Sequence, residues 1–410
     1  MNELTGAGTS AGTELTPAPR RVAAPATAYR ILATSAVFEP GFRGGGPIRS
    51  LAYIMDTLPA DIDLTLVTRD RDLGSATRYP QLSGRLVRRN GRSAVFYLDP
   101  VDPRHWLRLA RHVRARQVDL LYVNSLWSLF SLVPILAVAL RLVRVRAILL
   151  APRGELSPGA IAIKGRKKRL FLALWAPVLR RLGVRWHACS RLEETHIHAA
   201  VPGARVMVNG NESPIPDRPV PQVAPHDGPL RLVFVSRISP KKNLDVALAA
   251  VAGTSRPVDF DIYGPPEDEQ YWARCRLMIT TMPGHVRVRY RGELAADEVM
   301  PTFGGYDAFL FPTLGENYGH VILESLAAAC PVVCSDETPF SDLITAAGGE
   351  VVRPLTVARL TTVLDRLAAR SAGERAEAKE TAGRQFRLWR QRTQDLNVLD
   401  HARHFCRRPG

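Results

Sequence analysis

Short apolar segments recur along the chain and alternate with longer stretches whose apolar residues have helical spacing. The β-prone runs of the first half are 30–35, 64–68, 94–98, 120–124 and 147–151. This alternation predicts an α/β domain with a doubly wound parallel sheet, in which ligands bind outside the carboxyl ends of the strands. It directs attention to Asn124, Ser125 and the loop at 152–159.

The same pattern starts again after the most proline-dense segment, 213–228, which we interpret as an extended interdomain linker. A strand is predicted at 230–236, a polar loop at 237–243 and a helix at 244–251. A second α/β domain is therefore expected after the linker.

With 410 residues the chain is long enough for two or three domains that each bury a core. Residues 1–28 are small and polar with repeated Pro and Ala, and we expect a disordered tail there. The predicted domains are 29–212 and 229–385, and a helical pattern follows at 386–410.

The most informative stretch is 306–335, where a strand, a polar loop, a helix and a second strand follow one another. It contains Glu316 and Glu324 with seven residues between them. A helix throughout would put their Cα atoms roughly 12 Å apart, at about 1.5 Å rise per residue. Paired glycosidase carboxylates lie about 5 to 9.5 Å apart across one bond, so this spacing favours the two ends of one extended ligand.

The backbone amides of Asn317, Tyr318 and Gly319 would point out of the start of this helix, where the helix dipole favours an anion such as a diphosphate. The loop is therefore interpreted as a phosphate cradle with a carboxylate on either side. The alternative is an ordinary amphipathic helix with one capping and one solvated Glu.

Two further loops have residue types suited to an anion. Arg237 and Lys242 lie in the polar loop of the second domain, where two cations attract negative charge. Gly44, Gly45 and Gly46 precede a helix predicted to begin at Pro47, and glycines let backbone approach a ligand closely. The alternatives are a loose basic loop and a mere tight turn.

The stretch at 306–335 resembles the E-x7-E element of the family-4 retaining glycosyltransferases, which use nucleotide sugars, and Arg237 with Lys242 resembles the R-x4-K element of that family. The resemblance implies that Glu316 lies by the donor sugar and that Glu324 holds the ribose hydroxyls. It also implies that the two cations hold the donor diphosphate. The resemblance is strongest at 230–352 and weakest in the acceptor-binding half.

Members of this family have the GT-B fold, which implies two Rossmann-like domains facing a cleft and a C-terminal helix, 386–410, that crosses back to the first domain. The resemblance places Gly45 and Gly46 near the donor phosphates, and no cofactor beyond the nucleoside-diphosphate sugar is implied. The implied reaction moves a sugar to an acceptor hydroxyl with retention. Since no carboxylate can be named as nucleophile, a front-face route assisted by the leaving phosphate is expected.

Arg153 departs from the family pattern. Many members have a His-Gly pair in this loop, whereas this chain has Arg153-Gly154. Arg is always charged and cannot accept a proton, so a role that needs neutral imidazole is absent at this position. Arg153 could bind a phosphate or an acidic sugar of the donor, or it could form an ion pair with Glu155.

The formal net charge of +16 predicts attraction to nucleotide phosphates, an acidic membrane surface or nucleic acid. No nucleic-acid-binding motif supports the last of these. Residues 163–170 place cations before an apolar stretch containing Trp175, which is typical of an interfacial helix on anionic lipid and also of an ordinary surface helix. The partners expected are a nucleotide sugar, a sugar- or lipid-linked acceptor and an anionic membrane.

The five cysteines form no CxxC pair and are interpreted as reduced, mostly buried thiols. The N-terminus lacks the order of a signal peptide, and the apolar run 126–140 is too short for a membrane span, so it is predicted to be a buried helix. We therefore expect a cytoplasmic protein that can lie peripherally on the inner face of the membrane. Asp70-Arg71-Asp72 has the DxD form of a metal site but is interpreted as a surface loop, and no metal site is predicted.

Two rival hypotheses remain from the sequence. A sugar-nucleotide epimerase or a phosphorylase would keep the fold and change the reaction. The second hypothesis is a non-catalytic protein that binds a nucleotide sugar or a polyanion, in which Arg153 in place of His marks the loss of catalytic activity. The pathways implied by the resemblance are the biosynthesis of polysaccharides or other glycoconjugates, or of a glycosylated metabolite.

Overall fold

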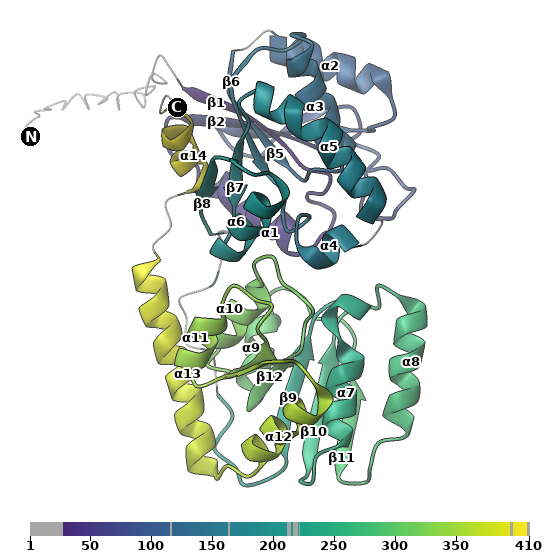
Figure 1. Ribbon diagram of the computed structural model, residues 1–410, viewed down its shortest axis with the longest axis vertical. Coiled ribbons are helices and arrows are strands. Elements are labelled where there is room, and N and C mark those ends of the chain that lie inside the picture. Colours follow the sequence, from purple (N-terminus) through teal and green to yellow (C-terminus); the bar gives the residue numbers. More distant parts are fainter. Residues whose placement is uncertain are drawn as a thin grey trace, which may run out of the picture.

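The computed structural model describes residues 28–114, 117–162, 165–210, 215, 220, 222–393 and 397–407. The tail predicted at 1–28, apart from residue 28, and much of the predicted linker lie outside the described residues. Figure 1 shows two domains, one above the other, each built on its own sheet.

Among the described residues, the upper domain has an eight-stranded sheet in the order β3-β4-β2-β1-β5-β6-β7-β8. Its strands are β1 (Tyr29–Thr34), β2 (Ile62–Arg69), β3 (Leu86–Arg88), β4 (Ser93–Leu98), β5 (Val118–Asn124), β6 (Val145–Ala151), β7 (Arg185–Ala188) and β8 (Val206–Val208). All neighbouring strands are parallel except β3 and β4. The short strand β3 was not predicted, because its three residues are largely exposed and have no hydrophobic alternation.

Helices cover both faces of this sheet. They are α1 (Gly46–Asp56), α2 (Pro103–Arg114), α3 (Leu129–Ala139), α4 (Pro158–Ala162), α5 (Gly165–Arg181) and α6 (Arg191–Ala200). Buried residues of α2, α3 and α5 form one core cluster, and those of α1 form another with the last helix, α14 (Val398–Arg407). This double covering explains why the central strand β5 is buried along its whole length.

The apolar run 126–140 forms α3, but the prediction of a buried helix is wrong for one of its faces. Phe130 and Ile135 lie in the core, whereas Leu136 is 43% exposed and Leu140 67% exposed. A run that is apolar all round has no polar face to mark its solvent side, so its pattern cannot show which residues remain exposed.

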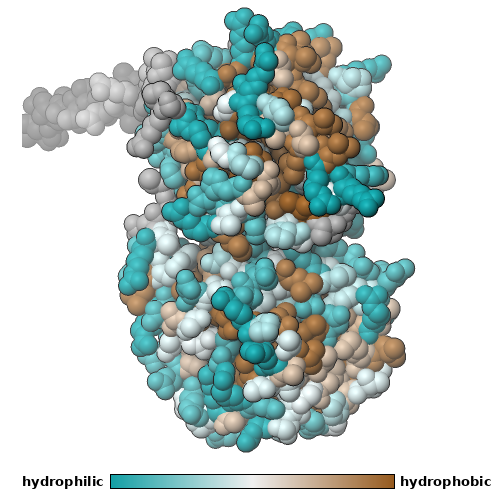
Figure 2. Space-filling view, in the orientation of Figure 1, coloured by the Kyte–Doolittle hydropathy of each residue, from teal (hydrophilic) through white to brown (hydrophobic). Residues whose placement is uncertain are grey.

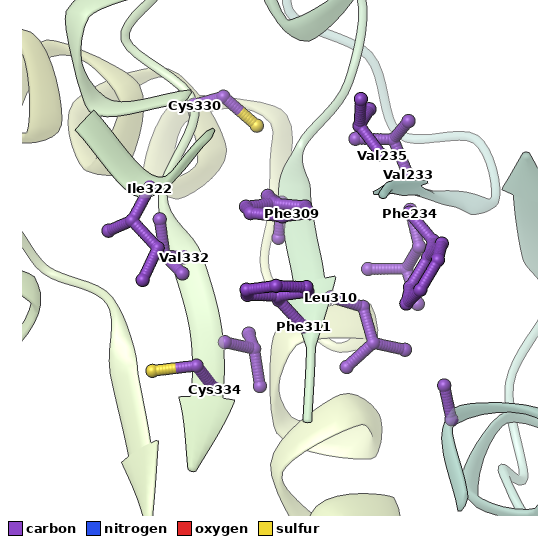
Figure 3. Close-up of a cluster of buried hydrophobic side chains, with 14 of the residues drawn as sticks. Val233, Phe234, Val235, Phe309, Leu310, Phe311, Ile322, Cys330, Val332 and Cys334 are labelled. Atoms are coloured by element: carbon purple, nitrogen blue, oxygen red, sulfur yellow. The ribbon is translucent and has the colours of Figure 1, made fainter. Parts of the chain in front are cut away.

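The lower domain has, within the described residues, a six-stranded parallel sheet in the order β11-β10-β9-β12-β13-β14. The strands are β9 (Leu230–Val235), β10 (Val258–Tyr263), β11 (Val286–Tyr290), β12 (Ala308–Phe311), β13 (Val332–Ser335) and β14 (Glu350–Val352). Figure 3 shows Phe309 and Phe311 of β12 stacked side by side, with their ring centroids 5.0 Å apart. These alternate residues share one face of the strand and belong to the core cluster of this domain.

The helices of this domain form two groups. They are α7 (Leu244–Ala252), α8 (Glu269–Thr280), α9 (Val299–Gly304), α10 (His320–Ala327), α11 (Ser341–Ala346), α12 (Val357–Ala368) and α13 (Ala372–Arg392). α7 packs with α8 and α12, while α10 packs with α9 and α13. The two groups lie on opposite faces of the sheet, because right-handed crossovers that run in opposite directions from the central pair β9 and β12 put their helices on opposite faces.

The crossing to the upper domain comes later than the predicted boundary at residue 385. α13 begins at Ala372 and continues to Arg392, and its Phe386 and Trp389 pack in the lower domain, where Trp389 contacts Phe340. Only α14, with Val398, lies in a core cluster of the upper domain. Figure 1 shows this helix beside the strands of the upper domain. The helical period is the same in both helices, so the sequence pattern did not separate them. We propose the division 29–212 and 229–392, with α14 belonging to the upper domain.

In each sheet, two neighbouring strands mark the point where the strand order reverses. In the upper sheet these neighbours are β1 and β5, and in the lower sheet they are β9 and β12. Loops that leave the carboxyl ends of such strands diverge and form a crevice. The loops after β1, β5, β9 and β12 are those that carry most of the predicted site residues.

Asp70, the first residue of the DxD sequence, is fully buried, so its interpretation as part of a surface loop is wrong. Its carboxylate accepts hydrogen bonds from Arg71 and Ser83, and Asp99 joins the same network through Arg71 and Arg78. A buried carboxylate is tolerated where cations and hydroxyls compensate it.

Candidate active site

Lys242 and Glu316 meet where the loops after β9 and β12 approach each other. Lys242 ends the short 3-10 helix Pro240–Lys242, and its Nζ donates to Oε1 of Glu316 at 2.5 Å. Both side chains are 11% exposed, and the Thr313 hydroxyl donates to the same carboxylate oxygen at 3.0 Å. A predicted phosphate-binding cation and a predicted sugar-binding carboxylate therefore form one buried pair.

Arg237, the other predicted cation, lies on the exposed rim of the same loop. Its Nη1 donates to Oε1 of Glu267 at 2.6 Å, with both side chains more than 40% exposed. An ion pair in this setting is weak because water screens it. Arg237 can therefore exchange Glu267 for another anion at little cost in free energy, whereas Lys242 must give up a buried partner.

The predicted phosphate cradle begins α10. Gly319 precedes this helix with φ of 86°, in the left-handed region that favours glycine. Within the described residues, the backbone N–H groups of Asn317 and Gly319 donate no hydrogen bond. The ring of Tyr318 packs between His320 and Phe340 in the core, so only its backbone faces the loop. This arrangement leaves amides available for an anion.

The upper domain contacts this loop through positions that have no side chain. A Cβ on Gly154 would lie 2.9 Å from Cβ of Asn317, and a Cβ on Gly46 would lie 3.0 Å from Cδ2 of His320. The Cys189 thiol also donates to the Asn317 carbonyl at 3.2 Å. Gly46 and Gly154 therefore permit close approach of the two domains, while Gly45 has open space around it.

Glu324 pairs with Arg49 of α1 in the upper domain, whose Nη2 donates to Oε1 of the carboxylate. Next to this pair, the Ser50 hydroxyl and Nε2 of His320 lie 2.9 Å apart. Burial, followed by the nearby charges of Arg49 and Arg153, lowers the pKa of His320 to about 3, so its ring is neutral. Sequence reasoning missed Arg49, Ser50 and His320, although all three lie within or next to the predicted loops.

Arg153 is held by a chain of hydrogen bonds between buried groups. Its Nε and Nη2 donate to Oδ1 of Asn124 at 3.0 and 2.7 Å, and Nη2 also donates to the Tyr122 hydroxyl at 2.9 Å. That hydroxyl lies 2.8 Å from Nδ1 of His187, whose Nε2 lies 2.9 Å from the Asn209 carbonyl.

A carbonyl can only accept, so Nε2 of His187 carries the proton and Nδ1 accepts from Tyr122. Burial is the main cause that lowers the pKa of His187 to about 3, which keeps this tautomer neutral.

Glu193 fixes the loop that carries Arg153. Its Oε1 accepts from the backbone N–H of Gly154 at 2.6 Å and its Oε2 from that of Cys189 at 2.8 Å. The residue is 3% exposed. Glu155, the ion-pair partner considered from the sequence, accepts from Ser125 and from the Leu126 amide, and burial raises its pKa. Sequence reasoning missed Glu193 because nothing local distinguishes it from its neighbour Glu194.

The described residues contain no group of three or more His, Cys, Asp or Glu side chains arranged to hold a metal ion. Among the same residues, no helix has the length and apolar character needed to cross a membrane. All five cysteines are free, and four of them are buried.

Solved structures with the same architecture are glycosyltransferases. HepE of Anabaena in complex with UDP-glucose has a TM-score of 0.63 at 17% identity, over 92% of this chain and 98% of that chain. WaaG, a glycosyltransferase involved in lipopolysaccharide biosynthesis, has a TM-score of 0.61 at 14% identity, over 92% of this chain and 100% of that chain.

Sucrose-phosphate synthase from Thermosynechococcus elongatus has a TM-score of 0.61 at 16% identity, over 88% of this chain and 98% of that chain. At these identities the likeness establishes the fold, which is GT-B, as predicted.

The family model described as Glycosyl transferases group 1 matches residues 220–385. A comparison with curated proteins finds no match. The fold is therefore that of the GT-B glycosyltransferases, and the family model covers the lower domain. Its lower domain is a glycosyl transferases group 1 domain.

Proposed function

We propose that the protein is a metal-independent, retaining glycosyltransferase of the family-4 kind. It moves a hexose from a nucleoside-diphosphate sugar to a hydroxyl of a sugar- or lipid-linked acceptor. The observation that carries the proposal is the buried contact between Lys242 and Glu316, made by the two loops at the switch point of the lower sheet. Ligands of doubly wound sheets bind at such a point.

The donor diphosphate binds between Lys242 and Arg237, with the amides of Asn317 and Gly319 at its other side. Glu316 contacts the transferred sugar, and Glu324 contacts the ribose. Phosphate oxygens replace the Glu316 carboxylate as the partner of Lys242, so the buried cation stays paired when the donor enters. The freed carboxylate then accepts sugar hydroxyls.

We propose that retention comes from a front-face step, as the resemblance to the family-4 enzymes implies. In the free protein Glu316 pairs with Lys242 and Glu324 with Arg49. With the donor bound, the proposal assigns Glu316 to the sugar hydroxyls and Glu324 to the ribose, so neither is given the role of nucleophile. In the proposed front-face step, the bond from the anomeric carbon to the diphosphate oxygen breaks. The acceptor oxygen bonds to the same face, and the acceptor proton passes to the leaving phosphate oxygen. Lys242 and Arg237 stabilise the charge that develops on the diphosphate.

A thermal-shift panel of UDP-, GDP-, ADP- and TDP-sugars, each with Mg²⁺ and with chelator, tests the donor class. A ligand at about 100 times its Kd stabilises a fold by about 2.7 kcal/mol, which is readily measured. We expect one base to be selected, with a shift that Mg²⁺ does not change, and a smaller shift for Glu324→Ala. HepE binds UDP-glucose, which makes UDP-glucose the first donor to try.

No shift with any nucleotide would contradict the proposal, and a shift that needs Mg²⁺ would contradict metal independence. With the selected donor, product analysis without acceptor separates the transferase from an epimerase. The stereochemistry of the product bond, measured by NMR, tests retention. WaaG belongs to lipopolysaccharide biosynthesis, and we propose polysaccharide or glycoconjugate biosynthesis as the first pathway in which to look for the acceptor.

We also propose that the protein contacts the anionic inner face of the membrane through its upper domain. Figure 2 shows hydrophobic residues gathered on this domain in the region of α3 and α5. The exposed leucines there are Leu136, Leu140, Leu142, Leu170 and Leu174. Exposed basic residues flank them on the same helices and loop, namely Arg141, Arg144, Arg166, Lys167 and Arg169. Apolar area rimmed by cations suits a surface of anionic lipid.

Co-sedimentation with vesicles of phosphatidylglycerol and phosphatidylcholine tests this contact. We expect Leu174→Ser to reduce binding by about fivefold or more, since each buried apolar side chain contributes about 1 kcal/mol or more. Leu277→Ser is a matched control, because Leu174 and Leu277 are both 69% exposed on helices but lie in different domains. Equal effects of the two variants, or equal binding to vesicles without phosphatidylglycerol, would contradict the contact.

A further inference from the structure

Two adjacent residues of α1 contact two residues that lie one helical turn apart on α10. Arg49 donates to Glu324, and Ser50 lies 2.9 Å from Nε2 of His320. Positions four apart on a helix share one face, so α10 presents both side chains to the upper domain. Gly46, in the first turn of α1, has no side chain and leaves room for the His320 ring.

The Arg49–Glu324 contact engages one oxygen of the carboxylate. Arg49 donates to Oε1, and within the described residues Oε2 of Glu324 accepts no hydrogen bond. The Glu324 side chain is 6% exposed, whereas that of Arg49 is 35% exposed. A carboxylate so far removed from water needs a charged partner to stay in place. The pair therefore holds Glu324 while leaving one acceptor oxygen open.

Ser50 and His320 add a second contact that fixes how α1 and α10 face each other. Ser50 is fully buried, and Nδ1 of His320 is buried with no hydrogen-bond partner in the described part of the chain. The ring is neutral, so the Ser50 contact is an uncharged hydrogen bond. Two contacts at successive positions restrict rotation of one helix against the other, which a single ion pair would permit.

We propose that Arg49 is a positioning residue for the ribose: by binding Oε1 of Glu324 from the opposite domain, it orients the carboxylate so that Oε2 accepts a ribose hydroxyl. This inference rests on the proposed function, which assigns the ribose to Glu324. It adds that recognition of the ribose depends on a residue of the upper domain. Because Arg49 and Glu324 belong to different domains, the carboxylate is oriented in this way only while α1 and α10 are in contact.

The test compares Arg49→Gln with wild type in binding a ribonucleoside diphosphate and its 2′,3′-dideoxy counterpart. UDP and dideoxy-UDP are used, or the pair with the base that the donor panel selects. Wild type should prefer the ribose form by about tenfold, the scale of one hydrogen bond to a charged group. In Arg49→Gln the preference should fall to about threefold or less, while affinity for the dideoxy form changes by less than about twofold.

Steady-state kinetics supply a second readout. The donor KM of Arg49→Gln should rise by about three- to tenfold with kcat nearly unchanged, because the lost contact is made in both the ground and transition states. Arg49→Lys should restore most of the preference for the ribose form. Arg111→Gln removes the same charge from an exposed position on α2 of the same domain and should match wild type.

Three results would overturn the inference. Equal loss of affinity for both nucleotides would make Arg49 a general contributor to structure or charge. Tighter binding by Arg49→Gln would make the ion pair a lock that the donor must break. An unchanged preference would show that Arg49 has no influence on the ribose. If wild type binds no nucleotide at all, the proposed function fails instead, so the two failures are distinguishable.

Discussion

Replacement of Lys242 by alanine is expected to lower turnover by about a hundredfold or more, the scale of one lost charge stabiliser in an active site. The leaving diphosphate gains negative charge as the glycosidic bond breaks. Lys242 is the buried one of the two predicted cations, and its ammonium lies 5.2 Å from the centre of the Phe311 ring. A charge in this dry setting stabilises the transition state more than the exposed Arg237 can.

The measurement is kcat with saturating donor and acceptor, together with the melting temperature of the variant. Arg256→Ala is the control, since it removes an exposed cation of the same domain, just before β10 and outside the two site loops. We expect it to change kcat by less than about threefold, as screened surface charges do. Equal turnover in Lys242→Ala and wild type would refute the assignment of Lys242 to the diphosphate.

A fall in stability alone could imitate this result, because Lys242→Ala leaves Glu316 buried without its partner. The double variant Lys242→Ala with Glu316→Ala removes both charges and should recover stability. Its turnover should stay at or below that of Lys242→Ala. Recovery of both stability and turnover would show that the pair is structural.

Replacement of Glu193 by alanine is expected to lower the free energy of unfolding by about 3 kcal/mol, because a buried and a partly buried backbone N–H group lose a charged acceptor. The groups belong to Gly154 and Cys189, on the two loops that contact Asn317. For a domain of this size the melting temperature should fall by about 6 to 12 °C. Differential scanning calorimetry measures both quantities.

Glu194→Ala is the matched control for this prediction. Glu194 is the next residue of α6 and pairs with Arg191, which is 84% exposed at its side chain. Loss of such a pair should change the free energy of unfolding by less than about 1 kcal/mol. If both variants lost the same stability, the effect would come from the helix and not from the two amide contacts.

Much of the fold could be predicted from the sequence because its strands are short, apolar and separated by helical patterns. The strands at β1, β2, β4, β5, β6, β9 and β12 were predicted within a few residues, and the order of alternation led to a doubly wound sheet. The hydrophobic pattern did not predict the structure where apolar and polar positions do not alternate, or where two successive helices have the same period. β3 is exposed, α3 is apolar on all sides, and α13 and α14 have the same period.

The chemistry-bearing loops could also be found from the sequence, since each motif is a local arrangement of charged and small residues. The sequence alone identifies Glu316, Lys242 and Gly46 as candidate site residues. It does not identify their partners, because Lys242 and Glu316 are 74 positions apart and Arg49 and Glu324 are 275 apart. Hydrophobic periodicity carries no information on contacts over such distances.

The sequence by itself determined the fold class, the order of the loops and the residue types that can hold a diphosphate, since these depend on local propensity and spacing. Only the tertiary structure decided which charged residues form pairs with each other. It placed Asp70 in a buried network, turned Gly46 and Gly154 into points of close approach and set Arg49 against Glu324. The physical reason is that burial and ion pairing depend on how two sheets and their helices pack, and that packing brings together residues from opposite domains.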